Sequence, residues 1–194
     1  MNRDSAHRDD ERRLDEGSER AQVSPWTKKE QAGRLLWMLV SMTLFRFSPH
    51  NAYRFRRALL RLFGAQVGRQ CVVRGTARIE IPWNLDIGDY SSVGDFARIY
   101  NLGKITIGRR CTVSQYAHLC AGTHDFTRQD MPLLRPAIVL KDDCWVAAEA
   151  FVGPGVTLGE GVLLGARSCA FKDLEPWLIY VGNPAKKLKE RELH

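Results

Sequence analysis

The stretch LCAGTHDF contains the residue pair best suited to chemistry, a histidine beside an aspartate at His124 and Asp125. A neutral imidazole can take a proton from a hydroxyl group, and general-base help of this kind is worth about 10²–10⁴-fold in rate. Asp125 is one candidate to orient the ring, but neighbouring residues of an extended chain point to opposite sides. We therefore expect a backbone carbonyl to orient His124. The alternative is an ordinary loop histidine that makes a corner hydrogen bond.

The place of His124 in a longer pattern favours the catalytic interpretation. The chain before it is regularly patterned, the pattern stops over the segment DFTRQDMPLLRPA, and it then resumes. Loops inserted into a repeat often carry the function of a repeat protein. We expect loop 125–139 to help select the acceptor. We expect His118, six residues before His124, to be a surface residue on the neighbouring face.

The surrounding pattern has a period of six residues. This period is neither helical nor a simple strand alternation, but it fits a strand-and-turn unit laid along one face of a prism. Glycine or alanine is expected where the backbone turns a corner tightly. With three units per turn, the fifteen units predict a solenoid of about five coils. Each unit starts at an aliphatic or small apolar residue: Val67, Val73, Ile79, Ile87, Val93, Ile99, Ile107, Val113, Leu119, Leu140, Val146, Val152, Leu158, Leu164 and Ala170.

The five cysteines include no CxxC pair. An odd count without such spacing argues against a disulfide framework or a zinc ribbon, and it fits a reducing cytosol. Four of them fall at or beside the compact position of the repeat, so we expect small core residues at Cys71, Cys111, Cys144 and Cys169.

The N-terminal part has a different character. Residues 1–24 are almost wholly polar or charged and are expected to be a disordered tail without the apolar stretch of a signal peptide. Residues 25–65 predict a helical segment, broken by SPHN at 48–51 and followed by a basic amphipathic helix that Gly64 ends. The longest apolar run is too short for the roughly 20 residues that cross a bilayer. Residues 26–63 therefore pack on the main domain or a partner subunit, or attach to an anionic membrane surface.

The overall charge is +7, from 29 basic and 22 acidic residues. This balance suits an anionic partner such as an acidic membrane surface or a phosphorylated small molecule. We expect the excess to be spread along the chain, because no long run of lysine and arginine occurs. Nucleic acid is therefore not an expected partner.

Several stretches resemble the hexapeptide-repeat acyltransferases, and among them most closely the O-acetyltransferases of colanic acid and other exopolysaccharides. The repeat itself specifies only the fold, whereas the histidine-containing interruption and the terminal GNPAK are typical of acetyl transfer. The resemblance covers roughly residues 55–190. The matching stretches are PWNLDIGDYSSVGD (82–95), IYNLGKITIG (99–108), SQYAHLCAGTHDF (114–126), WVAAEAFVGPGVTLGEGVLLGARS (145–168) and VGNPAKKLKE (181–190).

This resemblance implies an all-β solenoid, a left-handed parallel β-helix over residues 66–174. A cap over residues 175–194 would end in a short helix. It further implies a cytoplasmic homotrimer with active sites between subunits, with the inner face of the membrane as an alternative location. The enzyme would move an acetyl group from acetyl-CoA to a sugar hydroxyl of an exopolysaccharide or its lipid-linked precursor. No metal is expected.

The resemblance also implies roles for single residues. His124 would be the general base for direct attack, and Asn101, Asp125 and Trp145 would bind the acceptor. From the residues alone, other roles stay open. Asn101 could be a corner asparagine and Trp145 a tryptophan on the shaft surface. The C-terminal lysines could form a solvated basic tail, and the C-terminal segment could serve only to cap the shaft. The residues implied for the coenzyme are Ala147, Ala148, Gly165, Ala166, Lys172, Asn183, Pro184, Lys186 and, more weakly, Lys187.

Two other functions remain as alternatives. A γ-class carbonic anhydrase-like metalloenzyme would need a third histidine one or two coils earlier, and none occurs between His50 and His118. A non-catalytic β-helix scaffold is the other alternative, and the intact GTHDF and GNPAK argue against it.

Overall fold

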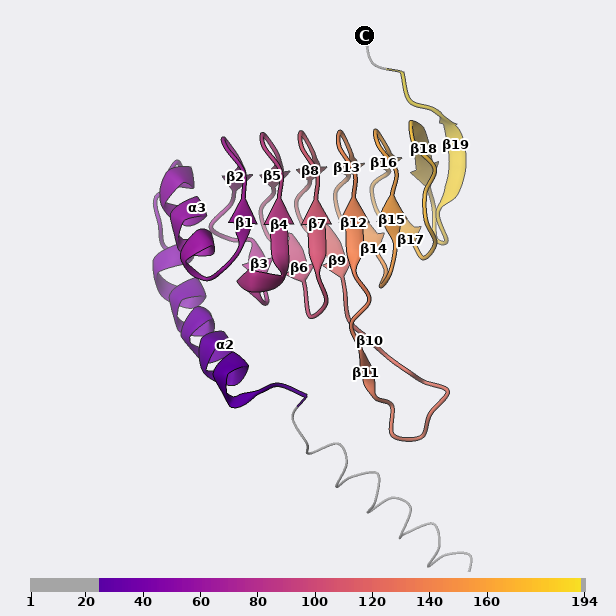
Figure 1. Cartoon of the computed structure of the whole chain (residues 1–194). Coiled ribbons are helices and arrows are strands. Elements are labelled where there is room, and N and C mark those ends of the chain that lie inside the picture. The colour runs from indigo at the N-terminus through magenta and orange to yellow at the C-terminus, as the bar shows by residue number, and fades with distance from the viewer. Residues whose placement is uncertain (1–24, 193–194) are drawn as a thin grey trace, which may run out of the picture.

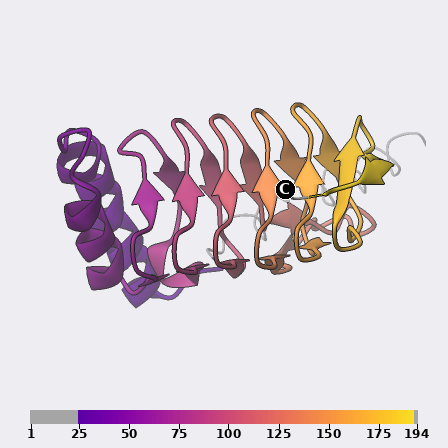
Figure 2. The ribbon, with the colours of Figure 1, turned by 90° about the horizontal axis from the view of Figure 1, so that it is seen from above.

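The computed structural model describes residues 25–192, so the tail expected over residues 1–24 lies outside the described residues. The main body is a parallel β-solenoid that matches the left-handed β-helix fold (Figure 1). Seen from above, the strands of successive coils lie in rows, with helices at one end (Figure 2). The solenoid predicted from the six-residue period is confirmed.

Each complete coil contributes one short strand to each of three sheets. The first sheet contains β1 (Gln66–Val67), β4 (Leu85–Ile87), β7 (Ile105–Ile107), β12 (Ile138–Leu140) and β15 (Thr157–Leu158). The second contains β2 (Val72–Val73), β5 (Ser92–Val93), β8 (Thr112–Val113), β13 (Trp145–Val146), β16 (Leu163–Leu164) and β18 (Leu178–Val181). The third contains β3 (Arg78–Ile79), β6 (Arg98–Tyr100), β9 (His118–Cys120), β14 (Phe151–Val152) and β17 (Cys169–Ala170).

The solenoid is slightly longer than the expected five coils. Five coils are complete, and β18, which pairs with β16, belongs to a partial sixth coil. A bridge between Leu158 and Leu174 continues the first sheet in the same direction. The extra partial coil was not visible in the repeat, because its residues no longer follow the six-residue spacing.

The repeat positions stack in register inside the shaft. In the first sheet Val67 pairs with Ile87, Ile87 with Ile107, Ile107 with Leu140, and Leu140 with Leu158. All five side chains are buried. Removing such a side chain from water contributes about 1.5–3 kcal/mol, so the stack supplies much of the stability of the shaft. Cys71, Cys111 and Cys144 are buried core thiols as predicted, whereas Cys169 is half-buried.

The corners are built differently from the expectation. Most corner residues with a left-handed backbone conformation are residues other than glycine, although such residues adopt a positive φ less readily. The small residue after the aliphatic position is needed for close packing instead, since a Cβ atom at Gly88 would lie 2.6 Å from the carbonyl carbon of Gly108 in the next coil. The corner residues with positive φ include Gln70, Tyr90, Phe96, Arg110, Tyr116, Asp143, Glu149 and Arg167.

Helices cover the N-terminal end of the shaft. They are α2 (Lys28–Val40), which continues as the π-helical turn η1 (Ser41–Phe45), and α3 (Tyr53–Leu62). Thr27 and Glu30 form a capping box at the start of α2. Trp37 and Phe45 are buried, and the indole N–H of Trp37 donates to the Ile79 carbonyl at 2.7 Å. This contact fixes α2 against the first coil.

The arginines of α3 close the open end of the solenoid. Strands β1 and β2 have no preceding coil, so their outer backbone groups need partners. Arg57 donates to the Cys71 carbonyl at 2.8 Å, and Arg61 donates to the carbonyl of Val67 at 2.9 Å. Arg56 is buried and donates to four acceptors: the carbonyls of Val73, Pro49 and His50 and the hydroxyl of Ser48.

The C-terminal cap is not the predicted short helix. The chain forms β18 and then β19 (Lys186–Glu190), which pairs antiparallel with β18. The last parallel strand leaves one row of backbone groups without a partner, and an antiparallel strand satisfies them directly. The prediction of a C-terminal helix was therefore wrong.

Replacing Arg56 with alanine should destabilise the protein strongly, because four buried or half-buried acceptors lose their donor. We expect the free energy of unfolding, measured by urea denaturation, to fall by about 2–4 kcal/mol. Arg54 is an exposed arginine on the same helix, and Arg54→Ala should change this free energy by less than about 0.5 kcal/mol. Equal effects of the two substitutions would contradict the role assigned to Arg56.

Candidate active site

His124 lies on a hairpin that projects from the shaft between β9 and β12 (Figure 1). The hairpin consists of β10 (Thr123–His124) and β11 (Leu133–Leu134), which pair antiparallel. The Nδ1 atom of His124 lies 2.6 Å from the carbonyl oxygen of Met131. Because a carbonyl only accepts, Nδ1 carries the proton in this bond and Nε2 is left as an acceptor. A backbone carbonyl thus orients His124, as the sequence led us to expect.

Asp125 does not contact His124 through its carboxylate. Its Oδ1 atom accepts from the backbone N–H of Thr127 at 3.0 Å and from the Thr127 hydroxyl at 2.6 Å. These hydrogen bonds hold the pKa of Asp125 below its usual range. Asp125 therefore shapes the turn of the hairpin, and the Met131 carbonyl, not the Asp125 carboxylate, orients the imidazole, as expected.

Asn101 is fully buried, and its amide is occupied by the backbone. Its Oδ1 atom accepts from the N–H groups of Glu80 and Ile81, and its Nδ2 atom donates to the Ile81 carbonyl. These bonds hold the segment that enters the 3₁₀ turn η2 (Pro82–Asn84). Asn101 lies at the corner between β6 and β7, as the alternative interpretation expects, but without a positive φ, and within the chain its buried amide bonds to the backbone.

His118 lies on the outer face of the shaft, as expected, but it is half-buried. Its ring makes edge-on contacts with Tyr100 and Phe151, at centroid distances of 6.3 and 5.4 Å. Its Nε2 atom is buried and has no hydrogen-bond partner. Burial, and secondarily the nearby Arg98, lower the pKa of His118. The side chain is therefore held in its neutral form on the outer face of the third sheet.

Trp145 lies on the outer face of the second sheet. Its indole N–H donates to the Ser114 hydroxyl at 2.9 Å, and its ring is partly exposed. It stands in register with Leu163, which pairs with Ile179, and these side chains line a surface depression of about 520 Å³ together with β19. Within one chain, Trp145 and His124 thus belong to different faces of the prism.

The small residues implied for the coenzyme lie at equivalent corners between the second and third sheets. Ala147 and Ala148 occupy this corner in the fourth coil, and Gly165 and Ala166 occupy it in the fifth. The two corners stack, because Arg167 donates its backbone N–H to the Ala148 carbonyl at 2.9 Å. They form a narrow strip of small residues, beside which the ion pair of Glu149 and Arg167 joins the same two corners.

The polar residues implied for the coenzyme lie near the same end of the shaft. Asn183 and Pro184 form the exposed turn between β18 and β19, and Lys186 is exposed at the start of β19. Lys172 follows β17 and lies at the corner that leads back to the first sheet. That is the corner from which the His124 hairpin leaves, two coils earlier.

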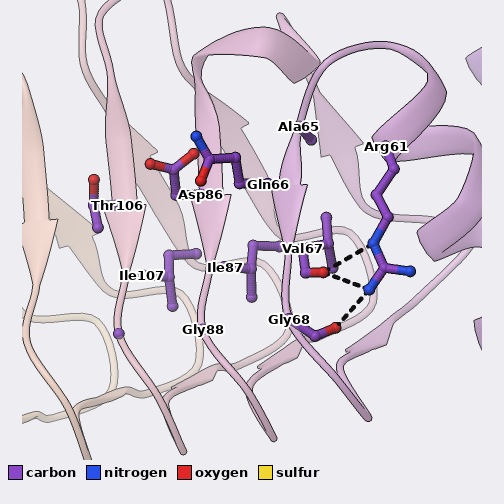
Figure 3. Close-up of a pocket in the computed structure, with 11 residues that line it drawn as sticks. Arg61, Ala65, Gln66, Val67, Gly68, Asp86, Ile87, Gly88, Thr106 and Ile107 are labelled. Atoms are coloured by element: carbon purple, nitrogen blue, oxygen red, sulfur yellow. Dashed lines mark hydrogen bonds between the residues drawn. The ribbon is translucent and has the colours of Figure 1, made fainter.

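The structure also shows a depression that holds no predicted site residue (Figure 3). Its volume is about 580 Å³, and it lies on the first sheet, where Arg61 contacts Val67 and Gly68. It contains neither a histidine nor a cysteine. Over residues 25–192, no three histidine, cysteine or acidic side chains converge as a metal site would require. The chemistry therefore points to the hairpin and not to this depression.

Met131 was missed in the sequence, although its carbonyl orients His124. It has a positive φ of 38°. No residue type signals which carbonyl will face a side chain seven residues away, because that depends on the path of the hairpin.

Comparisons with known proteins agree with this architecture. No protein-family model matches the chain. The Escherichia coli K12 protein named "Putative colanic acid biosynthesis acetyltransferase WcaF" is 46% identical over 156 residues, which are 80% of this chain and 86% of WcaF. The chain belongs to the hexapeptide-repeat acetyltransferases, alongside WcaF.

Solved structures of such acetyltransferases share the fold. The hexapeptide-repeat acetyltransferase VCA0836 of Vibrio cholerae O1 biovar eltor, complexed with acetyl coenzyme A, has a TM-score of 0.78 and 22% identity, covering 88% of this chain and 93% of its own. A galactoside acetyltransferase in complex with coenzyme A has a TM-score of 0.79 and 20% identity, covering 88% and 86%. The chain is thus an acyltransferase of this family by its similarity to WcaF, and these structures support its fold.

Replacing His118 with phenylalanine should make this acetyltransferase less sensitive to acid. The pKa of His118 is lower in the folded chain than the value of about 6.5 in an unfolded one, so unfolding takes up a proton as the pH falls through that value. The free energy of unfolding of the wild type should therefore fall relative to that of His118→Phe between about pH 7 and about pH 5. Urea denaturation at several pH values measures this difference, and a constant difference would contradict a buried neutral His118.

Proposed function

We propose that this acetyltransferase moves an acetyl group from acetyl-CoA to a sugar hydroxyl of an exopolysaccharide or its precursor, with His124 as general base. The observation that carries this proposal is the hydrogen bond from His124 Nδ1 to the Met131 carbonyl. It leaves Nε2 able to accept a proton, on an exposed side chain held by a hairpin.

The donor and the acceptor class are supported by the named relatives. VCA0836 is described in complex with acetyl coenzyme A, and the galactoside acetyltransferase with coenzyme A. WcaF is named for colanic acid biosynthesis, which points to an exopolysaccharide or its precursor as the source of the acceptor hydroxyl.

The proposed reaction is one direct transfer. As the sugar oxygen attacks the thioester carbon, Nε2 of His124 takes the hydroxyl proton. The tetrahedral intermediate then collapses, the carbon–sulfur bond breaks, and the protonated imidazole returns the proton to the leaving thiolate. The Nδ1–H bond to a carbonyl dipole suits both steps, because it keeps the ring in place and stabilises the transient imidazolium.

The placement of the groups supports an active site shared between subunits of the expected homotrimer. In one chain the strip of small residues lies at the corner where the third sheet begins, and the His124 hairpin leaves from the corner where that sheet ends. The width of a sheet therefore separates the proposed base from the proposed coenzyme strip. A neighbouring subunit can bring its own strip to this hairpin, so we propose that each active site forms between two subunits. The free thiols suit the cytoplasm, where we place the enzyme.

His124→Ala should abolish most of the acetyl transfer. We expect the rate with labelled acetyl-CoA and a panel of sugars to fall by about 10²–10⁴-fold, because the hydroxyl loses its base. Calorimetric binding of acetyl-CoA should be retained, since the imidazole acts on the acceptor. Asp125→Asn is the matched control, because an asparagine can still accept from Thr127. Activity of His124→Ala within about threefold of wild type would refute the assignment.

Met131 allows a test of how the imidazole is positioned. Proline fixes φ near −65° and cannot adopt the observed value of 38°, so Met131→Pro should displace the carbonyl that holds Nδ1. We expect kcat to fall at least about tenfold with little change in the KM for acetyl-CoA. Met131→Gly tolerates the positive φ and should stay close to wild type. Full kcat in the proline variant would show that the Met131 carbonyl does not position the base.

A further inference from the structure

The helix α2 and the turn η1 expose a run of apolar side chains, and one edge of this run, at Leu35 and Met38, borders a depression shared with Ile79 and Glu80 of the shaft. Trp37 and Phe45 occupy the opposite side and are buried. Figure 1 shows α2 at the N-terminal end of the molecule, reaching beyond the coils. Five large side chains, between 47% and 64% exposed, make up what we call the outer face: Leu35, Leu36, Met38, Leu39 and Met42.

Such a face is unusual on the surface of an isolated chain. Contiguous apolar patches mark sites that bind other proteins or membranes. Leu44 and Phe47 extend the exposed apolar surface beyond α2. None of the helices described over residues 25–192 is long and apolar enough to cross a bilayer. The outer face would therefore bind to the surface of a protein or a membrane, and these helices would not cross a bilayer.

The net charge of the protein is concentrated in the N-terminal segment that contains this face. Residues 25–63 contain eight lysines and arginines and a single acidic residue, Glu30. This excess equals the +7 of the whole chain, so the remaining residues are balanced. The expectation that the excess is spread along the chain was wrong, because acidic residues accompany the basic ones everywhere else.

The basic residues of this segment form two groups. One group caps the solenoid, and the other lies nearer the outer face. Arg56, Arg57 and Arg61 are occupied by carbonyls of the first coil and its approach. Lys28 and Lys29 are exposed in the first turn of α2, where a positive charge opposes the helix dipole and so has no stabilising role in the helix. Arg46 is exposed directly after η1, and Arg54 is exposed on α3. Exposed cations therefore flank both ends of the apolar face, and the guanidinium of Arg46 also lies over the Phe96 ring, 5.5 Å from its centroid.

We propose that the outer face binds the surface of an anionic phospholipid bilayer, with its apolar side chains in the headgroup region and the flanking cations on the lipid phosphates. An apolar stripe flanked by lysine and arginine is the pattern of helices that lie in this interface. A second copy of the chain is a poorer occupant, because pairing two such faces would bring their cations together with only Glu30 to offset them. Of the two interpretations of residues 26–63, we assign the membrane role to the outer face and the packing role to α3 and to the buried side of α2.

A contact joins this helix to the chain that leaves the catalytic hairpin. The guanidinium groups of Arg34 and Arg135 both lie over the ring of Trp26, at 4.5 and 4.2 Å from its centroid. Arg135 also donates to the Pro25 carbonyl at 3.2 Å. Binding by α2 would thus hold the His124 hairpin close to the lipid surface. Resting on the function proposed above, this identifies the acceptor as a sugar attached to a membrane lipid.

Sedimentation with vesicles tests the membrane contact. The full chain should sediment with phosphatidylcholine vesicles that contain phosphatidylglycerol, and much less with phosphatidylcholine alone or at high salt. Leu39→Glu should lower the partition by about tenfold or more. Leu188→Glu, at an equally exposed apolar residue on β19, should leave it unchanged. Lys28→Glu with Lys29→Glu should weaken binding, whereas Lys186→Glu with Lys187→Glu should not.

Separate outcomes distinguish this proposal from the catalytic one. His124→Ala should sediment like the wild type, and Leu39→Glu should keep acetyl transfer to a soluble sugar while losing transfer to a vesicle-bound acceptor. Three results would overturn the membrane proposal. They are no sedimentation of the wild type with anionic vesicles, equal partition of Leu39→Glu and Leu188→Glu, or a lower oligomer mass of Leu39→Glu in light scattering, which would assign the face to a second copy.

Discussion

Each coil of the solenoid is hydrogen-bonded to the next across three sheets, so a side chain that faces the shaft in one coil has a counterpart facing the shaft in the next. This register fixes where every later strand and every inserted segment can lie. Arg98 pairs with His118, and His118 pairs with Phe151, although a much longer stretch of chain lies between the second pair. The additional residues cannot enter the shaft without shifting every later strand to the wrong face. They leave at a corner as the β10–β11 hairpin, which is how a rigid shaft comes to hold a projecting histidine.

The same constraint creates two ends that must be closed. Parallel coils satisfy their backbone groups only through neighbouring coils, so the first and last coils each leave one row unpaired. At the N-terminal end, arginines of α3 donate to the carbonyls of the first coil. At the C-terminal end, β19 supplies a pairing strand. The basic composition of α3 therefore reflects a structural need, which separates it from the cations that flank the outer face of α2.

The geometry of the hairpin explains why one polar residue is suited to catalysis and its neighbours are not. His124 bonds to a backbone carbonyl through one ring nitrogen and offers the other. Asp125 is occupied by Thr127, Asn101 by the backbone before η2, and His118 is half-buried among aromatic rings. These residues stabilise the chain around the site. In the proposed mechanism His124 alone among them handles the proton.

The sequence by itself determined the solenoid, the buried positions of its core and the place of the interruption. A six-residue period of aliphatic residues has one way to satisfy both side-chain burial and backbone pairing, so the pattern and the fold are directly linked. The period ends after Ala170, and the sequence accordingly did not determine the partial sixth coil or the strand β19. Only the tertiary structure decided which carbonyl holds His124, that Asn101 is buried, and which arginines close the shaft. Those facts depend on which backbone groups from distant parts of the chain come close together in the fold. The pattern of residue types does not predict these contacts.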